Sequence, residues 1–257
     1  MNIQQIRNAT LKINYGGSKF LVDPWLQKKG TAFIAPSPWV SKNVPSPLTE
    51  LKMSVKEIVS GIDAIIVTHI HPDHFDRESA DMLDKSIPVF AQNEGDKKRI
   101  MDWGFKDVTV LSESGSKFGA VELVKVEGMH GESPMRAAGE VCGVVMKAPN
   151  EKTLYIAGDT VYYRGIEKNI KAHNPSVIVV NACAATLLVD GVNCRLIMNK
   201  EDVLMVCKMA PKAKIIASHM ETVNHASLNR AELRAYLAMQ GVGDMVIIPE
   251  DGEICML

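Results

Sequence analysis

Histidines in this chain are few, and six of the seven lie where a site for two metal ions would need them. Three fall in one short run, His69-Ile70-His71-Pro72-Asp73-His74, which has the pattern H-x-H-x-D-H. His130, His219 and His225 follow far downstream, each beside a strand-like or small-residue segment. Neutral imidazole offers a nitrogen lone pair near pH 7, so histidine is the commonest metal ligand. This clustering indicates metal chemistry rather than packing.

The spacing within the run suits two neighbouring ions. His69 and His71 are separated by one residue, so in extended backbone both side chains point the same way and can hold one ion. Asp73 and His74 follow a proline-bearing bend and can converge on a second ion beside the first. Two ions about 3.5–4 Å apart need further donors and a bridging ligand from elsewhere in the chain.

Three later residues supply donors of the required type. His130 lies in the glycine-flanked segment 128–131, and Asp159 and His219 each follow an apolar, strand-like run. The ends of strands are where α/β architectures place their sites. We therefore assign His69, His71 and His130 to the first ion, Asp73, His74 and His219 to the second, and Asp159 to the bridge between them.

The elements around these residues form a repeated pattern. Residues 64–68 are a continuous apolar run, typical of a fully buried strand, and deliver the histidine run at their end. Each half of the chain has β-rich sequence first and helix–strand units afterward, and residues 16–17 form a glycine turn between the first strands. This predicts two similar β-then-α halves, packed face to face in one four-layer α/β domain spanning residues 1–257.

Other segments are less regular. Residues 25–53 contain four prolines and two tryptophans, which forbids a helix or a central strand there and favours a candidate lid. Helices are expected over residues 77–85, 162–172 and 201–209, with Asn199 as a possible N-cap of the last of these. Asn229 stands three residues before Glu232, a capping-box pattern for the final helix. The last two strands, 245–248 and 253–256, are predicted to pair as a hairpin.

The motifs together resemble the metallo-β-lactamase superfamily. They are the run 68–74, Gly128-Met129-His130-Gly131, Ala157-Gly158-Asp159-Thr160 and Ser218-His219. The resemblance spans most of the chain and implies an αββα sandwich with the metals at one edge. The segment 219–225 makes the chain look most like cytoplasmic hydrolases of the ascorbate-6-phosphate lactonase type. Antibiotic-degrading members usually have cysteine where this chain has Asp159, so β-lactamase activity is not expected.

Several residues near the ligands are candidates for catalysis or substrate binding. Asp73 could take the nucleophile's proton and pass it to the leaving group. His225 could donate to a leaving group or hold a substrate anion, or it could only form a hydrogen bond at the approach to the last helix. Glu221 and Asn224 could orient metal ligands or substrate, and Tyr162 could line the pocket.

Composition restricts the partners and the compartment. The net charge is −1 and no basic run stands out, so nucleic acid is not an expected partner. No stretch approaches the roughly 18–20 apolar residues of a membrane span, and no signal peptide is recognisable. The five cysteines are odd in number and lack C-x-x-C spacing, so we expect a reducing cytoplasm. A small-molecule substrate is the expected partner, and the sequence leaves a homo-oligomer open.

Three classes of function fit these observations. The first, which we favour, is a hydrolase in which two divalent ions activate water against a small ester, lactone or phosphodiester. The second is a di-iron redox or oxygen-sensing protein, and the third is a non-catalytic, metal-stabilised binding module. Zinc is the expected metal, with manganese and iron also compatible, because histidine and carboxylate ligands suit all three.

Overall fold

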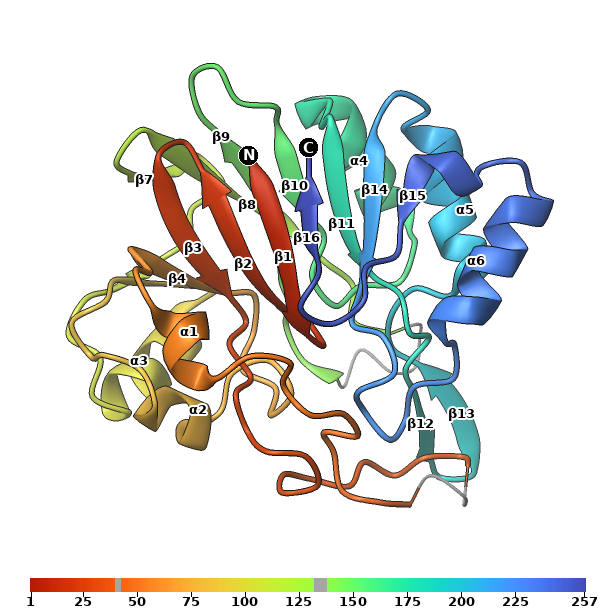
Figure 1. Ribbon diagram of the computed structural model, residues 1–257, viewed down its shortest axis with the longest axis horizontal. Coiled ribbons are helices and arrows are strands. Elements are labelled where there is room, and N and C mark those ends of the chain that lie inside the picture. The colour runs from red at the N-terminus through yellow and green to blue at the C-terminus, as the bar shows by residue number, and fades with distance from the viewer. Residues whose placement is uncertain (40–42, 132–137) are drawn as a thin grey trace.

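Two mixed β-sheets packed face to face form the centre of the protein (Figure 1). The computed structural model describes residues 1–39, 43–131 and 138–257. The first sheet has the order β16-β1-β2-β3-β4-β5-β6 and the second has the order β15-β14-β11-β10-β9-β8-β7. Each sheet contains antiparallel pairs on one side and parallel pairs on the other. The prediction of two similar halves is therefore confirmed.

The strands are short and most are buried. Those of the first sheet are β1 (Asn2–Arg7), β2 (Thr10–Tyr15), β3 (Ser18–Val22), β4 (Ala64–Val67), β5 (Val89–Ala91), β6 (Val108–Val110) and β16 (Ile254–Met256). Those of the second are β7 (Ser116–Phe118), β8 (Val121–Glu127), β9 (Cys142–Lys147), β10 (Leu154–Ile156), β11 (Val177–Asn181), β14 (Lys214–Ser218) and β15 (Val246–Ile247).

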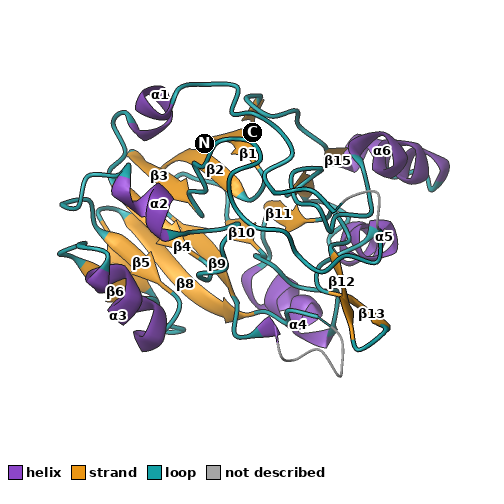
Figure 2. Cartoon of the chain, turned by 90° about the horizontal axis from the view of Figure 1, so that it is seen from below, coloured by secondary structure: helices purple, strands orange, loops and turns teal. Residues whose placement is uncertain are grey.

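Helices cover the outer faces of both sheets, as two views at right angles show (Figures 1 and 2). The helices beside the first sheet are α1 (Val55–Val59), α2 (Arg77–Asp81) and α3 (Glu94–Asp102). Those beside the second are α4 (Arg164–His173), α5 (Lys200–Met209) and α6 (Arg230–Met239), with a short 3-10 turn η3 (Gly243–Met245) after α6. The result is the predicted four-layer αββα sandwich.

Three clusters of buried apolar side chains fill the interfaces between the layers. One contains Phe20 and Ile66 of the first sheet together with Val144 of the second, so it lies between the sheets. A second joins β4 and β5 to the α1–α3 helices, and a third joins the second sheet to α4–α6. Burial of apolar area contributes about 25 cal/mol per Å², so these interfaces are the main stabilising term of the fold.

The helix starts follow the side chains that the sequence provides. Asn199 caps α5 and Asn229 caps α6, each in a reciprocal capping box with the residue three positions on. Both predictions are confirmed, because the asparagine oxygens accept from backbone N–H groups that the first helical turn leaves free. Helix α2 is shorter than the predicted 77–85 and ends at Asp81.

The predicted C-terminal hairpin is wrong. β15 pairs in parallel with β14 in the second sheet, whereas β16 pairs antiparallel with β1 in the first. The turn between them is held by another strand, since Gly252 N donates to Gln5 O (2.7 Å) and Gln5 N donates to Glu253 O (2.9 Å). Long-range pairing with β1 therefore outweighs the local turn signal. A small hairpin of β12 (Thr186–Val189) and β13 (Val192–Arg195) was not predicted either.

The proline-rich segment 25–53 contains neither helix nor strand among its described residues. Its two arms are held together by backbone hydrogen bonds, from Ala32 N to Ser46 O (2.9 Å) and from Ser46 N to Phe33 O (2.8 Å). Leu188 N also donates to Pro36 O (2.9 Å), so the segment lies beside the β12–β13 hairpin at the bottom of Figure 1. Its role as a lid stays a prediction.

None of the helices in the described part of the chain has the length and apolar character that crossing a membrane requires.

Candidate metal centre

Side chains from both sheets meet at one edge of the sandwich. The run 69–74 follows β4 of the first sheet, whereas His130, Asp159 and His219 follow β8, β10 and β14 of the second. Their potential ligand atoms form two groups, each with all atoms within 4.8 Å of one another. The first group is His69, His71 and His130, and the second is Asp73, His74, Asp159 and His219. The same residues were assigned from the sequence, with Asp159, here in the second group, as the predicted bridge.

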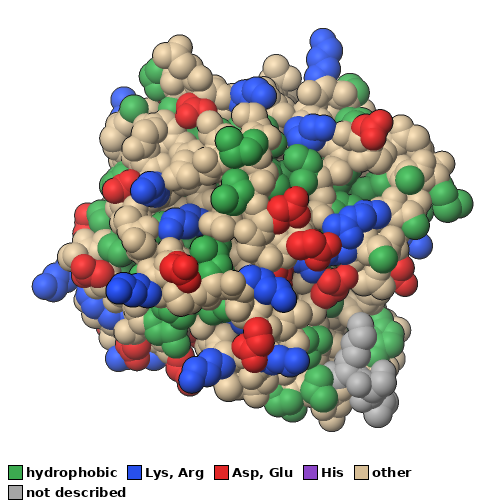
Figure 3. Space-filling model, in the orientation of Figure 1, with side chains coloured by type: hydrophobic (Ala, Val, Ile, Leu, Met, Phe, Trp, Pro, Cys, Tyr) green, Lys and Arg blue, Asp and Glu red, His purple; other side chains and the backbone are tan. Residues whose placement is uncertain are grey.

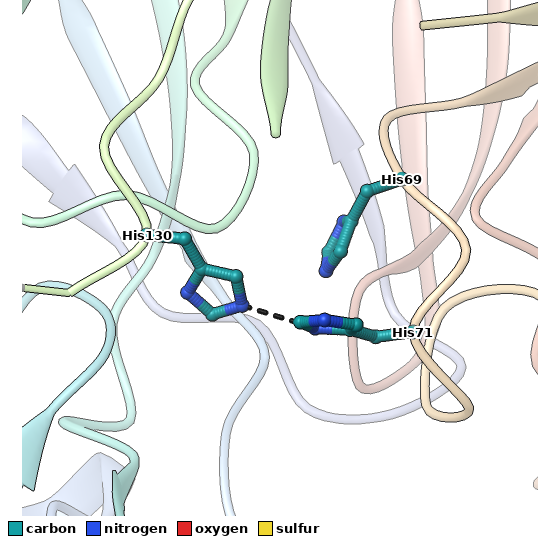
Figure 4. Close-up of side chains that lie close together, drawn as sticks. All are labelled: His69, His71 and His130. Carbon is teal, nitrogen blue, oxygen red and sulfur yellow. Dashed lines mark hydrogen bonds between the residues drawn. The ribbon is translucent and has the colours of Figure 1, made fainter. Parts of the chain in front are cut away.

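The first group is three imidazoles directed at a common point (Figure 4). His130 Nε2 lies 3.1 Å from His71 Nδ1, a distance that brings two ring nitrogens to one centre. The rings of His69 and His71 are 4.5 Å apart between centroids and steeply inclined to each other. Three nitrogens converging in this way match the protein ligands of a catalytic zinc that keeps an open position.

Asp159 faces both groups with the same oxygen. Its Oδ2 atom lies 3.1 Å from His74 Nε2 and 3.7 Å from His219 Nε2 in the second group. The same atom lies 3.7 Å from His130 Nε2 in the first group. Asp73 Oδ2 completes the second group at 3.2 Å from His219 Nε2. A carboxylate in this position can bridge two ions.

The residues fit a metal pair on chemical grounds. His69 Nε2 is fully buried and has no hydrogen-bond partner among the described residues. A buried polar atom without a partner is destabilising, typically by about 1–3 kcal/mol. Neutral imidazoles and ionised carboxylates are the donor set that divalent zinc, manganese and iron accept. A bound cation would therefore satisfy an atom that the protein alone leaves unpaired.

A shell of hydrogen bonds fixes the orientation of the candidate ligands. Asp23 Oδ2 lies 2.9 Å from His74 Nδ1, and Asp23 also accepts from Thr68 N and Thr68 Oγ1 (both 2.7 Å). Asn181 Nδ2 donates to Asp159 Oδ1 (2.7 Å), which leaves Oδ2 free to face the histidines. Cys183 Sγ lies 3.5 Å from His219 Nδ1. Such contacts hold the ring that carries the ligand nitrogen.

Gly158 is required by the backbone that delivers Asp159. It has φ +70°, and a Cβ there would lie 2.5 Å from the carbonyl oxygen of Cys142. Any larger residue would push β10 away from β9 at the point where Asp159 follows, so only glycine fits.

The protonation states of the metal-free protein follow from burial and charge. Burial lowers the pKa of His69 and of His130, so both are neutral near pH 7. Burial also opposes protonation of His74, but the carboxylates of Asp159 and Asp23 outweigh it and raise the pKa of His74 to about 10. In the metal-free protein, His74 is therefore protonated, and its positive charge partly compensates the carboxylates of Asp159 and Asp23.

The raised pKa of His74 predicts how pH affects the stability of the metal-free protein. Because the pKa of His74 is about 10 in the folded chain and ordinary in the unfolded chain, its contribution is fully present below about pH 6.5 and is lost as pH rises toward 10. We expect the unfolding free energy in chelator to fall by about 2 kcal/mol or more over that range. Urea unfolding at pH 7 and pH 9.5 measures it. The metal-loaded protein, whose ion replaces the proton, should lack this fall; equal falls in both forms would contradict the interpretation.

Asp23 offers a test of the supporting shell. Asp23→Asn keeps the shape but removes the charge beside His74, and we expect metal affinity at the second group to fall about 10- to 100-fold. Competition with a fluorescent chelator measures that affinity. Asp63→Asn is the matched control. Asp63 likewise accepts a hydrogen bond from a backbone N–H, that of Lys19, but it lies at the opposite end of β4. Unchanged affinity in Asp23→Asn would show that His74 needs no such support.

Three of the other predicted site residues, Glu221, Asn224 and His225, lie on the loop after β14, whereas Tyr162 lies between β10 and α4. His225 is buried, and its Nδ1 has no hydrogen-bond partner among the described residues. Burial lowers the pKa of His225 to about 4, partly offset by Asp73, so this imidazole is neutral near pH 7. Asn224 accepts from Ala35 N (3.0 Å) and donates to Ala35 O (2.8 Å), which fastens the 25–53 segment to the loop.

Glu221 and Tyr162 have contacts away from the candidate ligands. Both oxygens of Glu221 accept from Arg230, one from its backbone N (2.7 Å) and one from Nη1 (2.6 Å). Arg230 is buried and also donates to Asp251 Oδ1 (2.6 Å), so it joins the loop to the start of α6 and to the β15–β16 connection. The hydroxyl of Tyr162 donates to Glu167 Oε1 (3.3 Å). Direct roles toward substrate stay predictions for both.

Two cavities open beside the first group. One has a volume of about 540 Å³ and is lined by His130, Lys125 and three glutamates, Glu113, Glu127 and Glu140. The second, about 390 Å³, is lined by His69 and His71 and shares Gln92, Gly139 and Glu140 with the first. Within the described residues, both cavities therefore open onto histidines of the first group.

Comparison with known proteins finds a matching family model and similar proteins over the full length of the chain. A family model described as the beta-lactamase superfamily domain matches residues 18–220. UPF0173 protein YddR of Bacillus subtilis (strain 168) is 46% identical over 255 residues, which cover 98% of each chain. The solved structure of a possible metal-dependent hydrolase from Veillonella parvula DSM 2008 is 35% identical, with a TM-score of 0.94 over 100% of this chain and 99% of that one. An isothiocyanate hydrolase from Delia radicum gut bacteria is 36% identical, with a TM-score of 0.92 over the same shares.

Proposed function

Because this chain belongs to the metallo-β-lactamase superfamily, among its metal-dependent hydrolases, we propose that it hydrolyses a small uncharged substrate at a centre of two divalent ions. The observation that carries the proposal is the position of Asp159 Oδ2, within 3.7 Å of nitrogens in both ligand groups. A single-ion site would not need a carboxylate that faces both sets of histidines. Zinc is the ion we propose.

Two ions in these groups would lower the pKa of a shared water toward about 7 and polarise the substrate oxygen. Asp73 would then accept the proton of the attacking water and return it to the leaving group, since its carboxylate lies at the second group. The pKa of Asp73 is held well below its usual range, with burial opposed by the hydrogen bond and charge of His219 and by the charge of His74. Asp73 therefore starts each cycle ionised.

His225 has a different proposed role. With a pKa of about 4, caused mainly by burial, it carries no extra proton at neutral pH and cannot act as the acid. A neutral imidazole can still donate one hydrogen bond to a substrate oxygen. Phe33, whose ring lies 6.4 Å from that of His225, brings the 25–53 segment against it. We propose that this segment covers the site on the side of His225.

The charge of the described lining of the larger of the two cavities favours an uncharged substrate. The described lining of the larger cavity carries three carboxylates, on Glu113, Glu127 and Glu140, against the single ammonium of Lys125. A phosphodiester or phosphorylated lactone would bring negative charge toward this excess of carboxylates, which is unfavourable. Among the predicted classes, simple esters and lactones therefore fit better than phosphodiesters, and a phosphorylated substrate of the ascorbate-6-phosphate lactonase type fits poorly.

Isothiocyanates are the second candidate class. The observation that favours them is the full-length similarity to the isothiocyanate hydrolase from Delia radicum gut bacteria. The central carbon of an isothiocyanate is electrophilic and the group is uncharged, so it meets the same electrostatic condition as an ester. Water adds its oxygen to that carbon and a proton to the nitrogen. Asp73 can carry that proton as it would for an ester.

We propose a cytoplasmic location, because all five cysteines are buried and unpaired, as a reducing compartment allows.

The di-iron and non-catalytic classes of function are distinguished from a hydrolase by the test described below. A di-iron centre would give coloured protein with iron in elemental analysis. A binding module would hold metal and turn over none of the substrates.

The test combines elemental analysis with a substrate screen. Protein loaded with zinc is assayed against esters, lactones, phosphodiesters and isothiocyanates, with chelator-treated protein as the control. We expect two ions per chain, turnover of an uncharged class that chelator abolishes, and little turnover of phosphodiesters. A preference for phosphodiesters would overturn the substrate class. Absence of turnover in every class with two ions bound would overturn catalysis.

A further inference from the structure

Asn8 is a buried polar residue that the chemistry above leaves unused. It lies in the turn between β1 and β2, is 0% exposed and has φ +53°, in the left-handed region. Residues other than glycine adopt this region at some cost, and asparagine tolerates it better than most. Such a conformation persists where the surroundings hold the residue firmly.

The backbone carbonyl of Asn8 is the anchor of the loop after β14. It accepts from His219 N (2.9 Å) and Ser218 Oγ (2.9 Å), and also from Gln5 Nε2 (2.8 Å). His219 itself has φ +63°, a left-handed conformation that this backbone contact helps to hold. Asn8 therefore fixes one of the candidate ligands of the second group through the backbone.

The side chain of Asn8 contacts a second candidate ligand, Asp73, and also lies close to the ring of His219. Its Nδ2 donates to the carbonyl oxygen of Asp73 (2.9 Å) and lies 3.2 Å from His219 Nε2. The Asp73 carbonyl can only accept, so the amide must present nitrogen rather than oxygen on this side. One N–H of the amide is thus committed to Asp73, and the second is directed toward the metal-facing nitrogen of His219.

That second N–H needs a different partner once the centre is loaded. A nitrogen that binds a cation uses its lone pair to do so, and His219 Nε2 then cannot accept a hydrogen bond. We propose that Asn8 Nδ2 donates this hydrogen bond to an anionic oxygen held at the second group, either the nucleophile or the substrate. The proposal rests on the two-ion centre proposed above and makes Asn8 a further catalytic residue of it. Burial strengthens such a charge-assisted bond.

Anion selectivity distinguishes this donor role from a structural one. Fluoride is a strong hydrogen-bond acceptor that resembles hydroxide, whereas iodide is a weak one. In cobalt-loaded protein, followed by its visible spectrum, we expect Asn8→Gly to weaken fluoride binding about tenfold and to change iodide binding less than twofold. A variant that only loosened the site would weaken both anions alike. Glycine is chosen because it adopts φ +53° without strain and keeps the carbonyl anchor.

The matched control is Asn150→Gly. Asn150 also has a left-handed backbone, with φ +62°, but lies exposed in the turn between β9 and β10. This variant should bind fluoride, iodide and two ions per chain like the wild type. Asn8→Gly should also retain two ions, measured by elemental analysis, since Asn8 is not one of the seven candidate ligands.

The outcomes separate this proposal from the proposed function. If the wild type fails to bind two ions, the centre itself is wrong. If the wild type binds two ions and fluoride, and Asn8→Gly binds fluoride equally well, only the role of Asn8 is overturned. Should the glycine variant lose its ions, the side-chain amide nitrogen resonance of Asn8 is recorded in zinc-loaded wild type. We expect that resonance to shift on adding fluoride, and an unchanged resonance would contradict the proposal.

Discussion

Asp159→Asn is expected to reduce turnover by about a thousandfold or more and to leave no more than one ion firmly bound per chain. Asparagine has the same shape, and its oxygen can still accept from Asn181, as Asp159 Oδ1 does. The amide N–H groups would then face His74, where Asp159 presents Oδ2 at 3.1 Å. A donor replaces a negatively charged acceptor at the position that faces both groups. Elemental analysis and turnover of the substrate found in the screen measure the two effects.

Asp244→Asn is the control for that experiment. Asp244 is an exposed carboxylate in η3, and its backbone oxygen accepts from Lys214, at the end of β14 opposite to His219. Its substitution should change neither ion content nor turnover. Two tightly bound ions in Asp159→Asn would mean that the bridge comes from another residue or from water alone.

Asp73→Asn is expected to lower turnover about 10²- to 10⁴-fold even with saturating metal. Asp73 has two proposed tasks, as a ligand at the second group and as the carrier of the proton, and asparagine performs neither well. The first group should keep its ion, because His69, His71 and His130 form a set that excludes Asp73. Elemental analysis after removal of weakly bound metal should therefore find close to one ion per chain, against two in the wild type.

Rescue by small acids and bases adds a second test of the same variant. If Asp73 carries the proton, the residual activity of Asp73→Asn should respond to small added acids and bases, which can take over its task, while the wild type should not. A variant that recovers wild-type turnover once excess metal is supplied would show that Asp73 only binds metal and moves no proton.

The candidate ligands could be predicted from sequence because each carries a local signal. The run 69–74 contains four ligand-type residues within six positions, and His130, Asp159 and His219 each follow a strand-like segment. Strand ends gather at one sheet edge, so the order of these segments along the chain was enough to group them. The four-layer fold followed from the same alternation of strands and helices.

Two supporting residues, Asn8 and Arg230, could not be predicted because their partners lie elsewhere along the chain. Asn8 meets Asp73 across 65 positions and His219 across 211, and nothing in the sequence around Asn8 indicates either contact. Arg230 likewise resembles an ordinary helix residue until its contacts with Glu221, Pro249 and Asp251 are seen. The C-terminal hairpin was wrongly predicted for the same reason, since β16 pairs with β1 at the other end of the chain.

Anomalous diffraction from crystals of the zinc-loaded protein, recorded at the zinc edge, tests the central claim most directly. The account predicts two peaks about 3.5–4 Å apart, one bound by the nitrogens of His69, His71 and His130 and the other by Asp73, His74 and His219. Oδ2 of Asp159 should lie within about 2.0–2.2 Å of both peaks. A single peak, or two peaks that Asp159 does not join, would contradict it.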